Sequence, residues 1–254
     1  MKKIAIIGAG ISGLFIANLF KKNPYYQITI YEKNTSVALE EGYGVQLSIN
    51  SIKILNEIGF KKLENNEKFN PEKIDFYSNE NSNKICDLDI SDFNSEDCKY
   101  TTLKRSSLIN FLKADLEDLI KTGYNISKIN QQDKQIKLSF ENEEEKECDY
   151  LIISDGVFSK SKSLISKSEI KPKYNNTLAI RGILNKSPDN IDSKNITLFL
   201  GSDFHHVIYP VSPNGDLNFI AIMKYKLSSE EQKNYSLFSD NTFIEKVLQK
   251  IPFE

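Results

Sequence analysis

The sequence predicts an α/β protein in which a domain of alternating strands and helices is interleaved with a mostly antiparallel sheet domain. Three observations predict this fold. An apolar run near the N-terminus is broken by glycines 8, 10 and 13, a second strand pattern follows it, and from Tyr174 onward strand candidates alternate with turn clusters. Parallel sheets covered by helices and antiparallel sheets joined by turns leave these two different patterns.

The first element is the segment "KKIAIIGAGISGLFIANLFKK". Two lysines before an apolar stretch can also open a secretory signal peptide. A signal peptide has no use for glycines at G-x-G-x-x-G spacing, and no small-residue cleavage site follows them. We therefore expect a buried strand over Lys3–Ile7, a tight turn over Gly8–Gly13 and a helix over Leu14–Lys22, with a glycine-rich turn of another α/β protein as the alternative.

Each of the three glycines has its own physical reason in this interpretation. Gly8 allows the turn, Gly10 lets a pyrophosphate approach the main chain, and Gly13 lets helix and strand pack closely. The helix start supplies free N–H groups and a positive dipole end. The next strand, "QITIYEKN", ends at Glu32, close to the ~20-residue offset expected for an acid that binds a ribose hydroxyl. This context predicts a Rossmann-like dinucleotide-binding unit.

The next elements mix a loop, a helix and a hairpin. "EEGYGVQL" is expected to be a glycine-containing loop, followed by a helix over residues 50–58 that Gly59 ends. Residues 73–78 and 84–90 form a predicted hairpin. The segment "YTTLKRSSLINFLKADLEDLI" is expected to be an amphipathic helix entered through Ser106 and Ser107, so that Arg105 lies just before a helix start.

Two further strands, over residues 124–129 and 135–140, lead to the segment "CDYLIISDGVFSKSKSLI", with the acidic "ENEEEKE" as a solvated turn. The antiparallel part then comprises strands near 177–184, 195–201, 205–212 and 217–225 and a final helix over 241–251. The predicted dinucleotide domain is 1–72 with 99–168. The predicted substrate-facing sheet domain is 73–98 with 169–254.

Composition excludes several classes of protein. The 254 residues carry a formal net charge of −2, with dispersed basic residues, so no nucleic-acid footprint is present. No apolar run reaches the ~18 residues of a membrane helix. Cys86, Cys98 and Cys148 are far apart and odd in number, which favours reduced thiols of a cytoplasmic protein over disulfides or a zinc site. Arg105 and Arg181 are the only arginines, which favours planar contacts with phosphate or carboxylate at these positions.

The ordered set of motifs resembles one family, the class A FAD-dependent monooxygenases of the p-hydroxybenzoate and salicylate hydroxylase fold. "GAGISGLFIANLF…YEK" is similar to its FAD fingerprint, and "GYGVQLSINSIKILNEIGF" to its loop and helix beside the flavin. "LKRSSLINFL" resembles its arginine-containing segment and "YLIISDGVFSKSK" its Asp-Gly motif. "SDFHHVIYPVSPNGDLNFIAI" is similar to the sheet over the flavin ring. The resemblance covers essentially the whole chain.

The resemblance implies FAD as cofactor, NAD(P)H as co-substrate and O2-dependent hydroxylation of a small aromatic substrate. It implies these cofactor contacts: Gly8, Gly10 and Gly13 at the pyrophosphate, Glu32 at the adenosine ribose, Arg105 at the pyrophosphate or ribityl chain, Asp155 and Gly156 at the phosphates or the nicotinamide nucleotide, and Gly44 and Val45 near the flavin ring. The alternatives are a surface arginine for Arg105 and an ordinary turn for Asp155 and Gly156.

Substrate activation in this family of reactions needs a group that accepts or relays a phenolic proton. In "HHVIYPV" a strand would direct His205, Val207 and Tyr209 to one face, with His205 and Tyr209 ~13 Å apart. These two are the predicted catalytic residues, and Arg181 is the candidate for a substrate carboxylate. The alternatives are a core tyrosine and a surface histidine pair. A metal site is disfavoured because adjacent strand histidines diverge.

The sequence departs from the family pattern at one point. The family carries a later Gly-Asp motif that closes the FAD site, whereas Gly215-Asp216 here lies in a predicted hairpin turn. We therefore expect a truncated member that binds FAD more weakly. Two other functions stay open: a non-hydroxylating flavoprotein oxidoreductase of the same fold, or an inactive truncated fragment.

Overall fold

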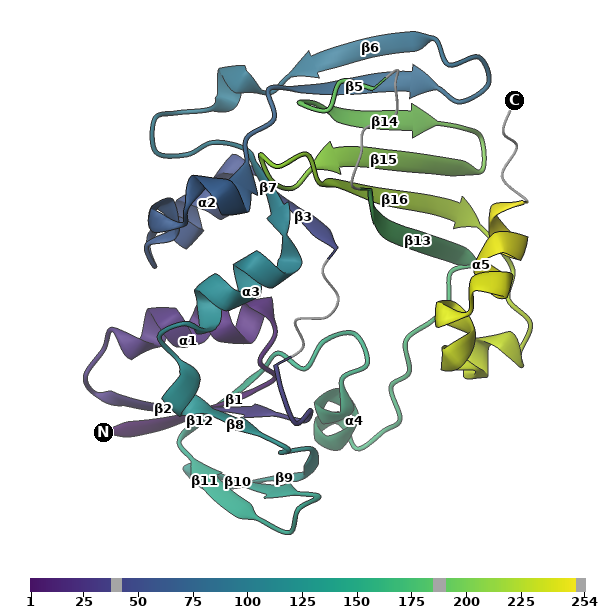
Figure 1. The fold of residues 1–254 in the computed structure, drawn as a ribbon. Coiled ribbons are helices and arrows are strands. Elements are labelled where there is room, and N and C mark those ends of the chain that lie inside the picture. The colour runs from purple at the N-terminus through teal and green to yellow at the C-terminus, as the bar shows by residue number, and fades with distance from the viewer. Residues whose placement is uncertain (38–42, 185–190, 250–254) are drawn as a thin grey trace. The chain divides into compact units, whose positions relative to one another are not determined.

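The computed structural model describes residues 1–37, 43–184 and 191–249 (Figure 1). The chain divides into two compact units, the first made of residues 1–42, 54–62 and 105–173, the second of 43–53, 63–104 and 174–254. The first contains a parallel sheet and the second a mostly antiparallel one. The predicted α/β class, with an interleaved antiparallel sheet domain, is confirmed. No helix in the described ranges is both long and apolar enough to cross a membrane.

A parallel sheet of order β12-β1-β2-β8 forms the centre of the first unit. The central strands β1 and β2 carry buried apolar residues, as expected where a parallel sheet is covered on both faces, and Ile6 and Ile30 are fully buried. The predicted strand–turn–helix–strand order is observed here. The elements are β1 (Lys2–Ile7), α1 (Ile11–Lys21), β2 (Tyr26–Glu32), β8 (Ile120–Thr122) and β12 (Tyr150–Ile153).

Helices and a small antiparallel sheet cover this parallel sheet. Helix α1 lies beside α3 (Arg105–Lys113), and the Asn18 amide donates to the Leu112 carbonyl at 2.6 Å (Figure 1). The strands β9 (Ile126–Gln132), β10 (Gln135–Phe140) and β11 (Glu145–Cys148) form the antiparallel sheet. Helix α4 (Lys160–Ser166) follows β12 after a turn.

Two predictions in this part of the chain were wrong in detail. The helix expected across residues 100–120 is instead strand β7 (Thr101–Lys104), the shorter helix α3 and a 3₁₀ turn over Glu117–Leu119. The β-branched threonines at the start favour the strand, so Arg105 opens the helix instead of preceding it. The acidic segment over residues 141–147 was expected to be a turn, but its last residues, from Glu145 on, form strand β11, which pairs with β10.

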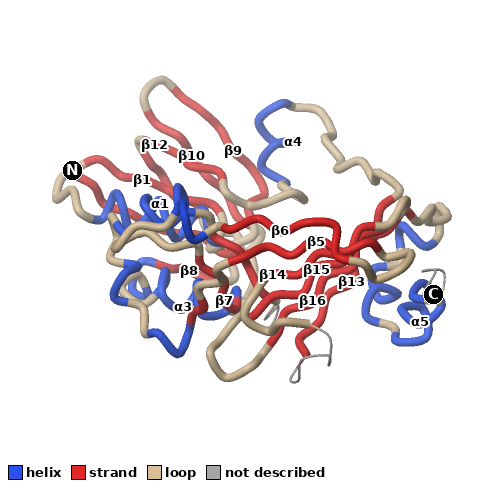
Figure 2. The backbone as a smooth tube through the Cα atoms, turned by 90° about the horizontal axis from the view of Figure 1, so that it is seen from above, coloured by secondary structure: helices blue, strands red, loops and turns tan. Residues whose placement is uncertain are grey.

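The second unit is built on a six-stranded sheet of order β13-β16-β15-β14-β5-β6, in which β14 and β5 are the one parallel pair (Figure 2). The pairing of β13, β16 and β15 is antiparallel and regular in register. The four strands predicted after Tyr174 are therefore observed. The strands are β5 (Lys73–Ser78), β6 (Lys84–Asp89), β13 (Thr177–Leu184), β14 (Ile196–Leu200), β15 (Phe204–Pro210) and β16 (Leu217–Lys224).

Apolar clusters pack on this sheet. One joins strand residues such as Phe204 and Met223 to Phe243 and Val247 of helix α5 (Asn241–Leu248). The other contains Tyr209 and is described below. The described chain also contains a three-stranded sheet of β3 (Gly44–Leu47), β7 and β4 (Lys68–Phe69), and helix α2 (Ile49–Asn56).

Strand β3 was not predicted, because residues 44–47 were expected to be loop. Its pairing with β7, and that of β4 with β7, changes the division of the chain. Residues 43–53, 63–72 and 99–104 lie in the second unit, whereas the sequence placed them in the dinucleotide domain. Residues 169–173 lie in the first unit.

Candidate nucleotide-binding site

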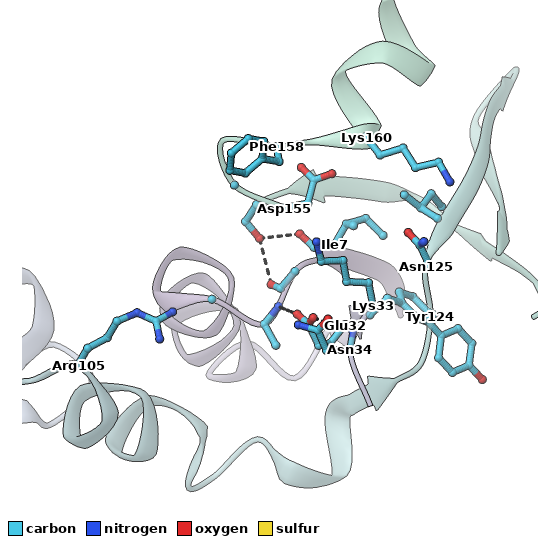
Figure 3. A pocket seen from close by; sticks show the side chains of 17 residues that line it. Ile7, Glu32, Lys33, Asn34, Arg105, Tyr124, Asn125, Asp155, Phe158 and Lys160 are labelled. Carbon is cyan, nitrogen blue, oxygen red and sulfur yellow. Dashed lines mark hydrogen bonds between the residues drawn. The ribbon is translucent and has the colours of Figure 1, made fainter. Parts of the chain in front are cut away.

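A cleft of about 440 Å³ lies in the first unit, where the parallel strands end (Figure 3). In sheets of this kind ligands bind outside the carboxyl ends of the strands. Four segments that follow β1, β2, β8 and β12 supply the cleft, together with the first residue of α3. The lining residues are Ile7, Gly8, Ala9, Gly10, Tyr31, Glu32, Lys33, Asn34, Arg105, Tyr124, Asn125, Ile126, Ser154, Asp155, Gly156, Phe158 and Lys160.

The three glycines of the first turn occupy different environments. Gly8 has φ of +100°, and a Cβ there would lie 2.5 Å from the Ser154 carbonyl oxygen. A Cβ on Gly13 would lie 2.0 Å from the Gly8 carbonyl oxygen, so helix α1 packs directly on the turn. A Cβ on Gly10 would meet nothing within 4 Å. Gly8 and Gly13 thus shape the turn, while Gly10 borders open space at the cleft.

Strand β2 holds the turn in place through hydrogen bonds. The Gly8 N–H donates to the Tyr31 carbonyl at 2.8 Å. Buried Glu32 accepts from the Ala9 N–H at 2.9 Å and from the Asn34 N–H at 3.0 Å, one bond on each carboxylate oxygen. Because each oxygen can accept a further bond, Glu32 can fix the loop and still bind a hydroxyl group in the cleft.

The first turn of α1 opens toward an anion. In the described chain no hydrogen-bond acceptor is found for the N–H groups of residues 10–13, as is usual for a helix start. The positive dipole end adds to these donors. Arg105 lies at this end of the cleft and brings a guanidinium that suits phosphate (Figure 3). Unpaired N–H groups and a guanidinium therefore lie at the same end of the cleft as the open space beside Gly10.

Tyr124, Asn125 and Lys160 lie at the wall of the other end of the cleft (Figure 3). The Tyr31 and Tyr124 rings lie 5.2 Å apart between centroids. The Tyr124 hydroxyl donates to Glu144 at 2.7 Å, which raises the pKa of Tyr124. Lys160 is paired with Glu141 at 2.5 Å. This end suits a flat group with polar edges.

Asp155 and Gly156 lie in the cleft wall, at the turn into α4. One Asp155 carboxylate oxygen accepts from the Ser161 N–H at 3.1 Å, and the other is buried with no partner among the described residues. Gly156 has φ of +82°, which favours glycine. The pair therefore shapes the turn at the cleft, and a phosphate or nicotinamide role for it stays a prediction.

Gly44 and Val45, predicted near a flavin ring, lie on β3 in the second unit. A Cβ on Gly44 would lie 2.7 Å from Asn218 Cβ and from Val211 Cγ1. The Gly44 N–H donates to Asn218 Oδ1 at 2.6 Å. Close packing of β3 on the sheet is thus a sufficient reason for this glycine.

The predicted catalytic pair and Arg181 also lie in the second unit. Tyr209 is 1% exposed and packs in a cluster with Ile196 and Val207. Burial raises the pKa of Tyr209 to about 12, although Arg181 and Gln46 act in the opposite direction. His205 is half-buried. The structure thus supports the core alternative for Tyr209, and its catalytic role stays a prediction.

His206, on the opposite side of β15 from Tyr209, stacks on Phe199 at 4.4 Å between ring centroids. Burial lowers the pKa of His206. The His206 ring therefore belongs to a row of aromatic side chains on the sheet. It lies on the other face from Tyr209 of the predicted catalytic pair.

The sequence analysis singled out six of the 17 residues that line the cleft. It did not single out Lys33, Asn34, Tyr124, Asn125, Ser154, Phe158 or Lys160. A usable signal existed, because each segment follows a parallel strand at its carboxyl end. The three-residue strand β8 was too short to identify from the sequence, which hid Tyr124 and Asn125.

Comparisons with known proteins place this geometry in context. No protein-family model matches the chain. It is 23% identical over 227 residues to a 3-amino-4-hydroxybenzoate 2-monooxygenase of Streptomyces cremeus, covering 87% of this chain and 56% of that protein. It is 24% identical over 224 residues to a 6-hydroxynicotinate 3-monooxygenase of Bordetella bronchiseptica, covering 84% of this chain and 56% of that protein. The chain thus spans about half the length of these relatives.

Solved structures share the fold. Klebsiella pneumoniae HpxO complexed with FAD and uric acid superposes with a TM-score of 0.80 at 16% identity, covering 89% of this chain and 57% of that one. A 2,6-dihydroxypyridine-3-hydroxylase from Arthrobacter nicotinovorans gives a TM-score of 0.73 at 18% identity, covering 90% of this chain and 57% of that one.

Proposed function

We propose, from the premise that this chain shares the fold of FAD-dependent aromatic monooxygenases and is similar to them in sequence, that its cleft binds FAD. We further propose that the protein hydroxylates a small aromatic compound with O2 and NAD(P)H. The relatives are named for hydroxylating aminohydroxybenzoate and hydroxynicotinate rings. The chain spans about half of each relative, so the reaction is a proposal for the whole protein.

One observation carries the proposal. Gly10 borders open space at a helix start, while Gly8 and Gly13 are wedged against the neighbouring backbone. Because the turn is closely packed at Gly8 and Gly13 and open at Gly10, a diphosphate would have room beside Gly10 to reach main-chain N–H groups. Arg105 supplies a counter-charge at the same end.

FAD fits the residues that are present. Residues 10–13 and Arg105 would hold the diphosphate, Glu32 the ribose, and the Tyr124 end the adenine. When bound, FAD would supply the redox and oxygen chemistry. The chain's own residues bind the cofactor, orient it and fix the position of the turn.

For the substrate, we propose Arg181 as the group that binds an anionic substituent. Arg181 is exposed on β13, and the structure gives it no ion pair among the described residues. A guanidinium makes bidentate contact with a carboxylate. Since its pKa is about 12, Tyr209 keeps its proton at neutral pH and could relay a proton only as a neutral hydroxyl.

The experiment is anaerobic and aerobic turnover of purified, FAD-supplemented protein against a panel of hydroxylated aromatic carboxylates. Substrate-stimulated NAD(P)H oxidation that yields hydroxylated product supports the proposal. Oxidation that yields only hydrogen peroxide supports a non-hydroxylating oxidoreductase instead. Failure to bind FAD at all supports an inactive remnant.

A further inference from the structure

The serine that follows β12 contacts the glycine turn through its side chain. The Ser154 hydroxyl lies 2.9 Å from the Ile7 carbonyl oxygen and 3.2 Å from the Gly8 carbonyl oxygen, and can donate to either (Figure 3). The Ser154 N–H also donates to the Ile7 carbonyl at 2.9 Å. Main chain and side chain of one residue therefore bind the same point of the turn.

The Gly8 carbonyl is the tightest point of the turn. It would lie 2.0 Å from a Cβ on Gly13, and the Ser154 hydroxyl oxygen would lie 2.7 Å from the same Cβ. The carbonyl is thus enclosed between the helix start and the serine. On the β2 side the turn is held by the Tyr31 carbonyl and the Glu32 carboxylate, which both accept from N–H groups of the turn. On the β12 side only the Ser154 side chain hydrogen-bonds Gly8 in the described chain.

We propose that Ser154 is a positioning residue for the diphosphate. Its hydroxyl holds the Gly8 carbonyl against β12, and this keeps the helix start, with its unpaired N–H groups, in position next to Gly10, which lines the cleft. The inference rests on the proposed FAD site. It predicts that the hydroxyl contributes to diphosphate binding without being required for adenosine recognition, which involves Glu32 and the Tyr124 end.

The test compares Ser154→Ala and Ser154→Cys with the wild-type chain. Cysteine has a similar shape but is a weak donor. We expect both variants to bind FAD and ADP about fivefold to tenfold more weakly, the loss of one hydrogen bond. Adenosine, measured by saturation-transfer NMR, should bind all three proteins equally. Amide hydrogen exchange at residues 8–13 should be faster in both variants without ligand.

Ser159→Ala is the matched control. Ser159 caps α4 through the Lys162 N–H and does not line the cleft. The Ser159→Ala variant should have a lower melting temperature than the wild type and an unchanged affinity for ADP. Wild-type affinity for ADP retained in Ser154→Ala, or full rescue by cysteine, would overturn the positioning role while leaving the FAD site intact. Equal weakening for adenosine would show general damage and also overturn it. A wild-type chain that binds neither FAD nor ADP would overturn both proposals.

Discussion

Gly10 and Gly13 lie three residues apart, yet the structure gives them opposite requirements. A side chain at Gly13 collides with the Gly8 carbonyl at 2.0 Å, and a side chain at Gly10 meets nothing. We expect Gly13→Ala to lower the free energy of unfolding by about 1–3 kcal/mol or more, as overpacking does. Gly10→Val should change it by less than about 0.5 kcal/mol.

The affinity for FAD should be affected more by Gly10→Val, although Gly13→Ala lowers the stability more. Gly10→Val places its methyl groups where the diphosphate would lie and should abolish FAD binding in a fluorescence-quenching titration. Urea unfolding of each variant supplies the stability scale. A stable Gly10→Val protein with wild-type FAD affinity would show that the cleft does not hold the cofactor in this way.

Tyr209 links burial to pH dependence. Its folded-state pKa of about 12 lies above the ordinary value of 10.0 because the ring is buried. Between these values the unfolded chain releases the proton and the folded chain keeps it, so stability falls as pH rises from 10 to 12. Below pH 10 the hydroxyl is neutral in both states and no such loss occurs.

Tyr209→Phe should remove this part of the alkaline loss. The difference in unfolding free energy, wild type minus variant, should fall by about 2 kcal/mol between pH 10 and pH 12. Urea titrations at several pH values measure it. A difference that is independent of pH would place the Tyr209 hydroxyl in a more solvated environment than the structure shows.

At the scale of elements, a buried side chain of β16 hydrogen-bonds the first residue of strand β3. Fully buried Asn218 accepts the Gly44 N–H at 2.6 Å, and its own amide nitrogen has no partner among the described residues. Removing the acceptor leaves the Gly44 N–H buried and unpaired. We expect Asn218→Ala to cost about 1–3 kcal/mol in urea unfolding.

Asn214→Ala is the comparison for this prediction. Asn214 is exposed in the turn between β15 and β16, so its substitution should be nearly neutral. Equal stability of the two variants would mean that the contact between β3 and β16 contributes nothing to the fold.

Elements with a strong local pattern were predictable, and those that depend on distant partners were not. The N-terminal strand and helix and the strands over residues 73–78, 135–140 and 177–184 follow from apolar periodicity. Strands β3, β7 and β8 have only three or four residues each. Segments this short carry too little periodicity to identify a strand, even though the threonines of β7 favour one. Their pairing with neighbouring strands is visible only in the structure.

At the scale of the whole molecule, the interleaving of two units was predictable and its boundaries were not. Near Tyr174 the sequence changes to strand patterns separated by turn clusters, and the structure divides the chain at this residue. The chain also passes from one unit to the other near residues 43, 54, 63 and 105, and the sheet of β3, β7 and β4 determines these boundaries. The glycines and Glu32 of the cleft were predicted from spacing, whereas Ser154 and the Tyr124 end required knowledge of which strands are neighbours.

The most direct test of the nucleotide site is a titration of the isotope-labelled chain with ADP, followed in amide ¹H–¹⁵N spectra. We expect saturable shifts in the four segments around the cleft, residues 8–13, 32–34, 124–126 and 154–156, with the shift of Gly10 among the largest. Amides of the six-stranded sheet should not shift. The absence of shifts at millimolar ADP, or shifts concentrated in the second unit, would contradict the assignment of the cleft.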